Sequence, residues 1–307
     1  MKVNSPFSAS VEAVIVYAIN TEYIISGYMK MYNIDVSNNF KNLNQIYLCK
    51  CPLTSLEFFY PLNLDGNSDF YEQLSLNNWY YNVNRWEHKE IINRIKEETS
   101  ILEIGSGDGV FLNNLTSQKK ISYTGLELNL AAIEKAKLKR INLISETLAN
   151  HVSKTYNVEK YDIVCSFQVL EHISDINLII QDSLKALKKG GRLIVAVPNN
   201  DASFMKNNSH PSKYLNMPPH HVNLFNEQSL YKLQEIFNLK LCEILKEPIQ
   251  ENHIDVLLYN EIARIFNNYT FFAKLFWYFK LNVFIKPFYR LTQKSSLGHT
   301  IIAIYEK

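Results

Sequence analysis

The chain has 307 residues, of which 47% are hydrophobic and 20% are charged, so it should fold around a core of its own. Its formal net charge of +2 gives no field strong enough to favour nucleic acid or an acidic macromolecule as partner. We therefore expect no nucleic-acid partner.

Cysteine usage points to a reducing compartment. Cys49, Cys51, Cys165 and Cys242 are too few and too scattered to form a disulfide framework. The apolar run Val11 to Ile19 contains an acidic residue and follows no basic leader, so it resembles neither a signal peptide nor a membrane span. We expect a cytoplasmic protein.

Residues 1–85 show no regular alternation of strands and helices and are predicted to form an N-terminal extension. Apolar residues between Val11 and Met31 recur near helical spacing, which predicts a helix. The C-x-C pair Cys49 and Cys51 has no second pair nearby, so we expect two semi-buried thiols and no zinc site. Phe58 to Trp86 is rich in aromatic residues, which either pack this extension or form a lid over a ligand, and packing is the preferred interpretation.

The most informative stretch is LEIGSGDGVF, Leu102 to Phe111. A buried strand leads into three glycines at alternate positions and then into a helix, so the backbone of the turn can approach a ligand closely. A dinucleotide-binding turn requires a glycine or alanine where this chain has Val110, which weakens the interpretation as an NAD-dependent oxidoreductase or epimerase.

After this turn, strands and helices alternate in a pattern that predicts a mainly parallel sheet with helices on both faces. The helix before the last of these strands has a Ser or Asp cap, lysines in its last turn and a glycine stop at Gly190. The predicted strands are Ile121 to Leu128, Ile141 to Ile144, Tyr161 to Phe167 and Gly191 to Pro198, and the predicted helices are Asn129 to Arg140 and Ser174 to Lys189.

Glu127 lies near the end of the second strand, 20 residues after Gly107. Ligands of such sheets bind beyond the carboxyl ends of the strands, and the two oxygens of a carboxylate can accept both hydroxyls of a ribose. Because NAD-binding enzymes use the same device, Glu127 indicates a ribose without choosing the cofactor.

Three motifs choose the cofactor. The pattern E-x-G-x-G-x-G from Glu103 resembles motif I of the class I S-adenosylmethionine-dependent methyltransferases. YDIVCSFQVLEHISD, Tyr161 to Asp175, resembles motif II of the small-molecule members, and KKGGRLIVAVPN, Lys188 to Asn199, resembles their strand-five motif. The resemblance covers Trp86 to Leu245 and a last strand. It implies a Rossmann-like α/β fold with a mostly parallel seven-stranded sheet, and S-adenosyl-L-methionine as cofactor.

The resemblance also implies a set of cofactor-binding residues. Glu146 follows the third strand, where the family usually holds the adenine amino group with an acidic side chain, and Gln168 is expected to face the methionine part. The full predicted set is Glu103, Gly105, Ser106, Gly107, Gly109, Glu127, Leu128, Glu146, Phe167 and Gln168.

Histidines are the candidate catalytic residues. His220 and His221 follow two prolines on a loop at the ligand-binding end of the sheet, and similar methyltransferases carry H-x-x-x-F here, which matches His221 to Phe225. His221 is the preferred general base, His220 is the second choice, and a purely structural role is the alternative. His172 is a third candidate, because some relatives with E-x-x-E-H bind a metal there. Since this chain has the poorer ligand Gln168 at the first position, we expect no metal, and the alternative is a metal held by Glu171, His172 and one of His220 or His221.

Leu239 to Lys246 and His299 to Glu306 resemble the last two strands of the family sheet, with an insertion between them. From Ile262 to Tyr305 there is no acidic residue, while basic and aromatic residues alternate. Such a segment suits a membrane surface, a lipid-linked phosphate or a nucleotide diphosphate. We expect broken helices, with Pro287 as one break, that cover the acceptor site, and peripheral membrane contact through residues 264–294 is an open alternative.

The predicted organisation has four parts: an N-terminal extension or lid (1–85), a methyltransferase core (86–247), a helical aromatic and basic insertion (248–297) and the last strand of the core sheet (298–307). The predicted function is methyl transfer to an oxygen, nitrogen or carbon atom of a small-molecule, sugar or lipid-linked acceptor. A non-catalytic module that binds S-adenosylmethionine is a further alternative, which the intact Glu103 and Glu127 disfavour, and an RNA methyltransferase is disfavoured by Gln168 and the modest charge.

Overall fold

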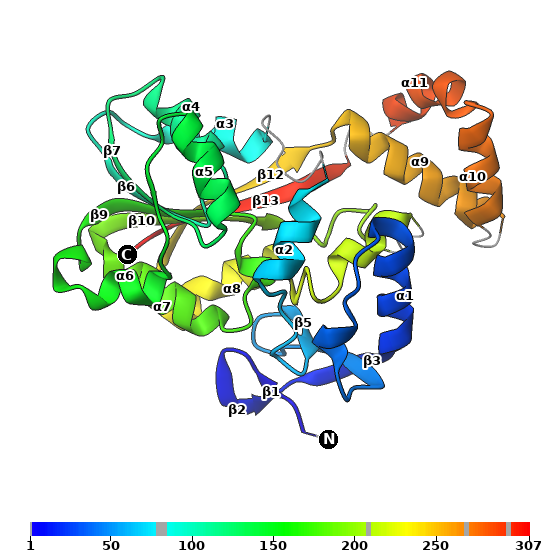
Figure 1. Ribbon diagram of the computed structural model, residues 1–307, viewed down its shortest axis with the longest axis horizontal. Coiled ribbons are helices and arrows are strands. Elements are labelled where there is room, and N and C mark those ends of the chain that lie inside the picture. Colours follow the sequence, from blue (N-terminus) through cyan, green and yellow to red (C-terminus); the bar gives the residue numbers. More distant parts are fainter. Residues whose placement is uncertain (1, 78–84, 207–209, 267–269, 293–295) are drawn as a thin grey trace.

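The computed structural model describes residues 2–77, 85–206, 210–266, 270–292 and 296–307 (Figure 1). Trp79, Tyr80 and Tyr81 of the aromatic stretch lie outside the described residues. Among the described helices, none is long and apolar enough to cross a bilayer.

A seven-stranded sheet in the order β12-β13-β10-β9-β6-β7-β8 forms the centre of the molecule. Six strands run in the same direction, and β13 runs antiparallel to them between β10 and β12. The predicted mostly parallel, seven-stranded Rossmann-like sheet is confirmed. The strands are β6 (Ser100–Ile104), β7 (Ser122–Leu126), β8 (Leu143–Ile144), β9 (Tyr161–Phe167), β10 (Leu187–Pro198), β12 (Lys240–Pro248) and β13 (Leu297–Glu306).

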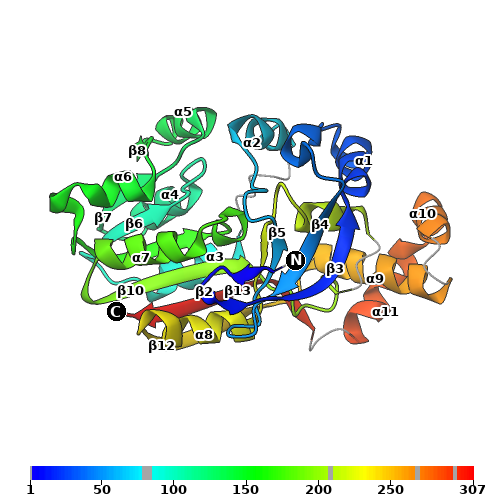
Figure 2. The same ribbon diagram turned by 90° about the horizontal axis from the view of Figure 1, so that it is seen from below.

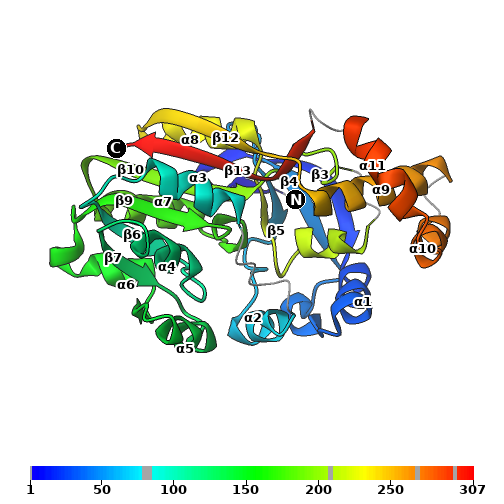
Figure 3. The same ribbon diagram turned by 90° about the horizontal axis from the view of Figure 1, so that it is seen from above.

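Helices cover both faces of this sheet, as the alternation predicted (Figures 1 and 3). Neighbouring residues of each strand point to opposite faces, so Leu102 and Val164 join one apolar cluster while Ile101 and Ile163 join the other. The first cluster packs against α6 (Leu148–Ser153), α7 (Ile176–Ala186) and α8 (Glu227–Phe237). The second packs against α3 (Trp86–Arg94), α4 (Val110–Thr116) and α5 (Leu130–Leu138).

Most predicted boundaries in the core differ from the observed ones by at most two residues, but the one between α7 and β10 is wrong by more. Helix α7 is capped by Asp175, as expected, but it ends at Ala186 and not at Lys189. Leu187 already pairs with Tyr161 of β9, so the chain enters β10 earlier than predicted. Gly190, the predicted helix stop, lies inside β10 with φ of 73°, where the register between β9 and β10 shifts.

The N-terminal extension forms a second, antiparallel sheet in the order β11-β5-β4-β3 (Figure 2). Its strands are β3 (Val14–Asn20), β4 (Gln45–Lys50), β5 (Glu57–Tyr60) and β11 (Asn223–Leu224), and it is preceded by the short hairpin of β1 (Asn4–Ser5) and β2 (Ser8–Glu12). Cys49 and Cys51 are buried free thiols, as expected. Helices α1 (Thr21–Tyr32) and α2 (Ser68–Ser75) pack on this sheet.

The predicted helix over Val11 to Met31 is therefore only half correct. Its first part is strand β3, which is rich in β-branched residues and pairs with β4. The side chain of Asn20 accepts a hydrogen bond from the amide of Glu22 and begins α1 at Thr21. Phe58, Phe59 and Phe70 are buried in apolar clusters, so these aromatic residues pack the extension as expected.

The insertion consists of α9 (Glu251–Ile265), α10 (Thr270–Tyr278) and α11 (Asn282–Thr292), which project from the body of the protein (Figures 1 and 3). Pro287 lies inside α11, so the predicted break at this proline is wrong. The carbonyl that loses its helical donor to the proline belongs to Val283, whose residue is 60% exposed, and water can satisfy it.

Candidate active site

A cavity of about 1870 Å³ opens at the carboxyl ends of the parallel strands. Its walls come from the central sheet, from α2 and α3, from the loop that carries His220 and His221, and from the start of α9. Of the described insertion, only Gln250, His253 and Val256 line it, so the expected cover by the whole insertion is wrong. Helices α10 and α11 lie on the far side of α9 (Figure 1).

The glycine turn forms one rim of the cavity. Gly105 and Gly107 have φ of 68° and 55°, a conformation that other residues rarely adopt. A Cβ on Gly105 would lie 2.6 Å from Cγ2 of Val169, so no side chain fits there. The amide of Gly107 donates to Oε2 of Glu127 over 2.7 Å, which places the glycine turn and the predicted ribose-binding carboxylate side by side.

Backbone amides that follow Glu127 fix the orientation of its carboxylate. Its Oε1 accepts hydrogen bonds from the amides of Leu128 and Asn129, each over 2.8 Å. Asn129 in turn caps α5, because its side chain accepts from the amides of Ala131 and Ala132. The carboxylate is thus fixed where β7 ends and α5 begins.

Nine of the ten predicted cofactor-binding residues line the cavity, and Gly109 is the exception. It precedes α4 with φ of 73°, and a Cβ there would lie 3.0 Å from Cγ2 of Ile141 and 3.1 Å from Cβ of Ala136. This glycine is required for packing the turn against the region of α5, and its predicted contact with the cofactor is not supported by the structure. Glu146 does line the cavity, but both its oxygens already accept hydrogen bonds, from His151 and Lys154, each over 2.6 Å.

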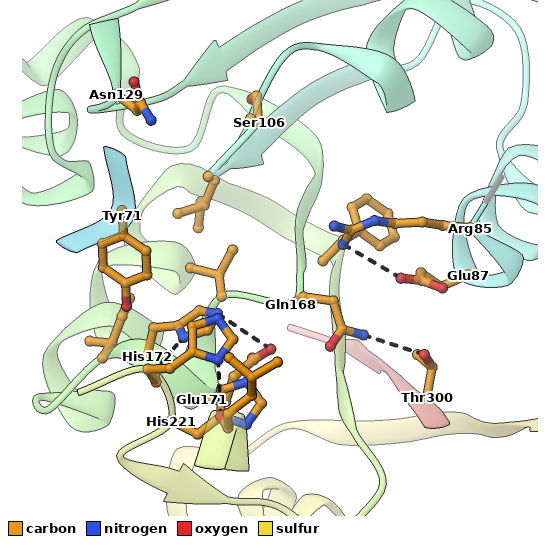
Figure 4. A pocket seen from close by; sticks show the side chains of 18 of the residues that line it. Tyr71, Arg85, Glu87, Ser106, Asn129, Gln168, Glu171, His172, His221 and Thr300 are labelled. Carbon is orange, nitrogen blue, oxygen red and sulfur yellow. Dashed lines mark hydrogen bonds and ion pairs between the residues drawn. The ribbon is translucent and has the colours of Figure 1, made fainter. Parts of the chain in front are cut away.

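Acidic and basic groups meet on the wall next to the glycine turn. Glu103 is 2% exposed, burial raises the pKa of its carboxyl well above the usual value, and its Oε2 has no hydrogen-bond partner among the described residues. Arg85 forms an ion pair of 3.8 Å with Glu87 on the same wall. Gln168 lies between this pair and the histidines, and its amide donates to Thr300 over 3.4 Å (Figure 4).

The three predicted catalytic histidines form one cluster. The ring centroids of His172, His220 and His221 are 4.4 to 5.0 Å apart, and one potential ligand atom from each lies within 4.8 Å of the others. Burial lowers the pKa of His172 to about 4 and those of His220 and His221 well below the usual value, so the rings are neutral at pH 7.

Oxygen acceptors fix the tautomer of each ring. Nδ1 of His172 donates to the carbonyl of His220 over 2.5 Å, Nδ1 of His220 donates to the carbonyl of Leu215 over 2.9 Å, and Nδ1 of His221 donates to Oδ1 of Asn216 over 2.9 Å. Because Nδ1 carries the proton in each neutral ring, Nε2 is the basic nitrogen.

The cluster also contains a buried carboxyl, that of Glu171, which the sequence analysis considered only as part of an alternative metal site. Glu171 is 1% exposed, and neither of its oxygens has a hydrogen-bond partner among the described residues. Nε2 of His172 is 3.7 Å from its Oε1 (Figure 4). Burial raises the pKa of Glu171 to about 8, which makes it a second group that can exchange a proton near neutral pH.

The N-terminal sheet holds the histidine loop in place. Strand β11 follows the histidines and pairs with β5, the amide of Phe59 donates to the carbonyl of Val222, and the hydroxyl of Tyr28 donates to the carbonyl of Met217 over 3.0 Å. On the other side, the amide of Val222 donates to the carbonyl of Glu171 over 2.8 Å. The loop is thus clamped between the extension and the end of β9.

Further residues of the cavity were not predicted. Seven of the eight histidines line it, together with the buried glutamates Glu87, Glu103, Glu171 and Glu247. No local sequence pattern marks the residues that were not predicted. The unpredicted lining residues with ionisable side chains include Arg85, Glu87, His88, His210, Glu247, His253 and His299.

A seven-stranded sheet with one antiparallel strand next to its edge, a glycine turn after the central strand and a carboxylate after the next one define a class of protein, the S-adenosylmethionine-dependent methyltransferases. The profile of the family described as "Methyltransferase domain" matches residues 79–244. The chain belongs to this family and is an S-adenosylmethionine-dependent methyltransferase.

Curated relatives and solved structures were also compared. The ubiquinone biosynthesis O-methyltransferase of Citrobacter koseri is 26% identical over 176 residues, and that of Escherichia fergusonii is 24% identical over 180 residues. Each match covers 54% of this chain and 68% of the relative. A SAM-dependent methyltransferase from Archaeoglobus fulgidus is 17% identical with a TM-score of 0.48, and the match covers 72% of this chain and 91% of that one. The YjhP protein from E. coli is 16% identical with a TM-score of 0.48, covering 75% and 96%.

Proposed function

We propose that this methyltransferase modifies a hydroxyl oxygen of a small acceptor that binds beside the histidine cluster. The observation that carries the proposal is the group of Glu171, His172, His220 and His221, which brings neutral imidazoles and a buried carboxyl together on one cavity wall. A hydroxyl must lose its proton during methyl transfer, and such groups can receive it. The relatives that are named as O-methyltransferases support this choice.

The cofactor half of the cavity fits S-adenosylmethionine, which supplies a methyl group on a positively charged sulfur. Gly105 and Gly107 line the cavity without side chains, where the nucleoside would bind, and Glu127 beside them would accept its ribose hydroxyls. Oε2 of Glu103, which has no hydrogen-bond partner among the described residues, and the guanidinium of Arg85 lie on the wall that would receive the amino and carboxylate groups of the methionine part. Gln168 separates this half from the histidines.

In the acceptor half, His221 is the proposed base. Asn216 holds the proton of His221 on Nδ1, so Nε2 is ready to take the acceptor proton. Glu171 is the second proton-holding group of the cluster. The remaining walls exclude water and orient the acceptor, and the cavity exceeds the roughly 300 to 1,000 Å³ that one drug-sized ligand occupies, which leaves space for two ligands.

The proposal is tested by supplying the purified full chain with methyl-labelled S-adenosylmethionine and a cell extract divided into organic and aqueous fractions. Mass spectrometry of the labelled product should locate the methyl group on an oxygen. His221→Ala should lower turnover by roughly 10² to 10⁴ fold and leave calorimetric affinity for the cofactor unchanged. Label only on nitrogen or carbon, or unchanged turnover of the variant, would remove the proposal.

The same cluster also fits a divalent cation, because one ligand atom from each of His172, His220 and His221 lies within 4.8 Å of the others and Glu171 has no partner among the described residues. A cation there would draw in the acceptor oxygen as a Lewis acid. Metal analysis of the purified protein and assays with and without a chelator separate the two candidates. Full turnover in a metal-free sample would exclude the metal-assisted mechanism and leave general-base catalysis as the remaining candidate.

A further inference from the structure

Helices α10 and α11 carry the largest exposed apolar residues of the insertion. Helix α11 has no buried residue, and Val283, Phe284, Phe288 and Leu291 are 60%, 72%, 73% and 62% exposed. The neighbouring segment of α10 and its turn is similar, with Phe271, Tyr278 and Phe279 exposed by 60% or more. So many exposed large apolar side chains on two neighbouring elements are typical of an interaction site.

The polarity of α11 is inverted relative to an ordinary surface helix. At about 100° per residue, Phe284, Phe288 and Leu291 fall within about 60° of one another, and Lys286 lies on roughly the opposite side. That opposite side faces α9. Nζ of Lys286 lies 2.7 Å from Oδ2 of Asp255, and Arg290 lies 2.5 Å from Oε1 of Glu251. The charged side of α11 therefore points toward the protein and its apolar side points outward.

The charge around this apolar face favours an anionic partner. No acidic residue occurs from Ile262 to Tyr305. Lys274 and Lys280 are exposed and form no ion pair with another described residue, whereas Lys286, Arg290 and Arg264 are paired with acids of α9. Self-association through this face would bring lysines against lysines. Phosphate head groups would instead complement them.

We propose that the outer face of α10 and α11 binds the surface of an anionic lipid bilayer, with the apolar side chains at head-group depth and Lys274 and Lys280 on lipid phosphates. None of the described helices is able to span a bilayer, so the contact is peripheral. Tyr278, which is 80% exposed, suits this depth, because its ring combines apolar area with a polar group.

The location of this face connects it to the active site. Helix α9 contributes His253 and Val256 to the acceptor wall and supports both α10 and α11 on its other side. Docking would therefore bring the acceptor half of the cavity close to the lipid. The membrane inference rests on the proposed function and specifies its substrate class: the acceptor is a hydroxyl compound that is dissolved in, or attached to, the lipid bilayer.

The test is flotation of the full chain with vesicles of phosphatidylcholine alone or mixed with phosphatidylglycerol. We expect binding to the mixed vesicles, loss of binding in Phe284→Ser/Phe288→Ser, and a loss of roughly 5-fold in affinity for each of Lys274 and Lys280 changed to alanine. The matched control Leu138→Ser/Tyr156→Ser changes two residues that are 86% and 70% exposed on other elements and should float like the wild type.

The outcomes are separable from those of the proposed function. The membrane inference is overturned if the wild type binds neither kind of vesicle or binds both kinds equally. It is also overturned if Phe284→Ser/Phe288→Ser binds the mixed vesicles as well as the wild type does. A dimer in sedimentation velocity that the same double variant dissolves, without vesicle binding, overturns it in favour of self-association. Vesicle binding is measured without any methyl transfer, so a wild type that binds vesicles but transfers no methyl group counts only against the proposed chemistry. The affinity of Phe284→Ser/Phe288→Ser for the cofactor should equal that of the wild type, which shows that the variant is folded.

Discussion

Gly105 illustrates how one missing side chain shapes the cofactor half of the cavity. It shares a positive φ with Gly190, at 68° and 73°, so alanine is strained at either position. Only at Gly105 would the added Cβ also meet a neighbour, Cγ2 of Val169, at 2.6 Å, whereas at Gly190 no atom lies within 4 Å. Alanine at Gly190 thus tests backbone strain alone, whereas alanine at Gly105 tests strain together with a steric clash at the cavity wall.

We expect Gly190→Ala to lower the free energy of unfolding by about 1 kcal/mol and to leave cofactor binding intact. Gly105→Ala should lower it by more and weaken calorimetric binding of S-adenosylmethionine or its demethylated product at least tenfold, since Val169 must move into the cavity wall. Equal cofactor affinity of the two variants would contradict the assigned role of the glycine turn.

Glu171 gives stability a defined pH dependence. Burial raises the pKa of its carboxyl from 4.5 to about 8 in the folded protein. Because the folded pKa is the higher one, the contribution to stability is fully present below pH 4.5 and is lost as the pH rises through 8.

The prediction is made for the difference between wild type and Glu171→Gln, measured by urea unfolding between pH 4.5 and 8. Relative to the variant, the wild type should lose stability with a slope of at most about 1.4 kcal/mol per pH unit. Glu134→Gln, at an exposed position of α5, is the control and should show no such slope. A flat difference for Glu171→Gln would mean that this carboxyl is ionised in the folded protein.

At the scale of elements, the pairing of β11 with β5 connects the histidine loop to the N-terminal sheet. Tyr28 is fully buried and its hydroxyl donates to the carbonyl of Met217, three residues before His220. Tyr305 is an equally buried tyrosine whose hydroxyl donates to Leu230 over 2.6 Å, on the side of the sheet covered by α8. Comparing Tyr28 with Tyr305 therefore separates an effect on the position of the histidine loop from an effect on the stability of the whole protein.

Tyr28→Phe and Tyr305→Phe should each lower the free energy of unfolding by about 1 kcal/mol, the usual loss for one buried hydrogen bond. Only Tyr28→Phe should also lower methyl transfer, by a few fold, because the loop backbone before the histidines loses an anchor. Steady-state turnover with saturating cofactor is the measurement. A similar drop in Tyr305→Phe would show that turnover follows stability alone.

The sequence predicted the central elements well because their signals are local. β9 has the predicted bounds, Tyr161–Phe167, and Asp175 caps α7 as expected. Strand β3 was taken for a helix because the decisive contact, its pairing with β4, involves residues some thirty positions away. The cofactor half of the site follows one motif, whereas Arg85, His253 and His299 reach the cavity from distant parts of the chain.

At the scale of the whole molecule, the insertion has an apolar core of its own, around Leu258, Ile262 and Ala273, separate from the two clusters that pack against the central sheet. The ion pairs of Lys286 and Arg290 with α9 are the polar contacts that hold α11 in its inverted orientation. Helix α11, which has no buried residue, can therefore loosen while the central sheet and its covering helices stay folded.

We expect Asp255→Ala to expose α11 to limited proteolysis several-fold faster, since Lys286 loses its 2.7 Å partner, while the main thermal transition is unchanged. The control is Glu261→Ala on the same helix, which removes only the local pair with Arg264. Cleavage sites are identified by mass spectrometry. A lowered main transition in Asp255→Ala would show that the insertion and the core unfold together.

The pairing of β11 with the N-terminal strands also bears on how the substrate specificity of this enzyme can evolve. The wall to which we assign the cofactor is made by neighbouring strands of the central sheet and the turns that follow them. The loop with His220 and His221 instead leads into β11, a strand of the sheet that also contains β3, β4 and β5. Substitutions within the first 60 residues can therefore reshape the acceptor pocket without disturbing the nucleoside wall. Selection for a new substrate and preservation of the methyl donor would then act on different stretches of the gene.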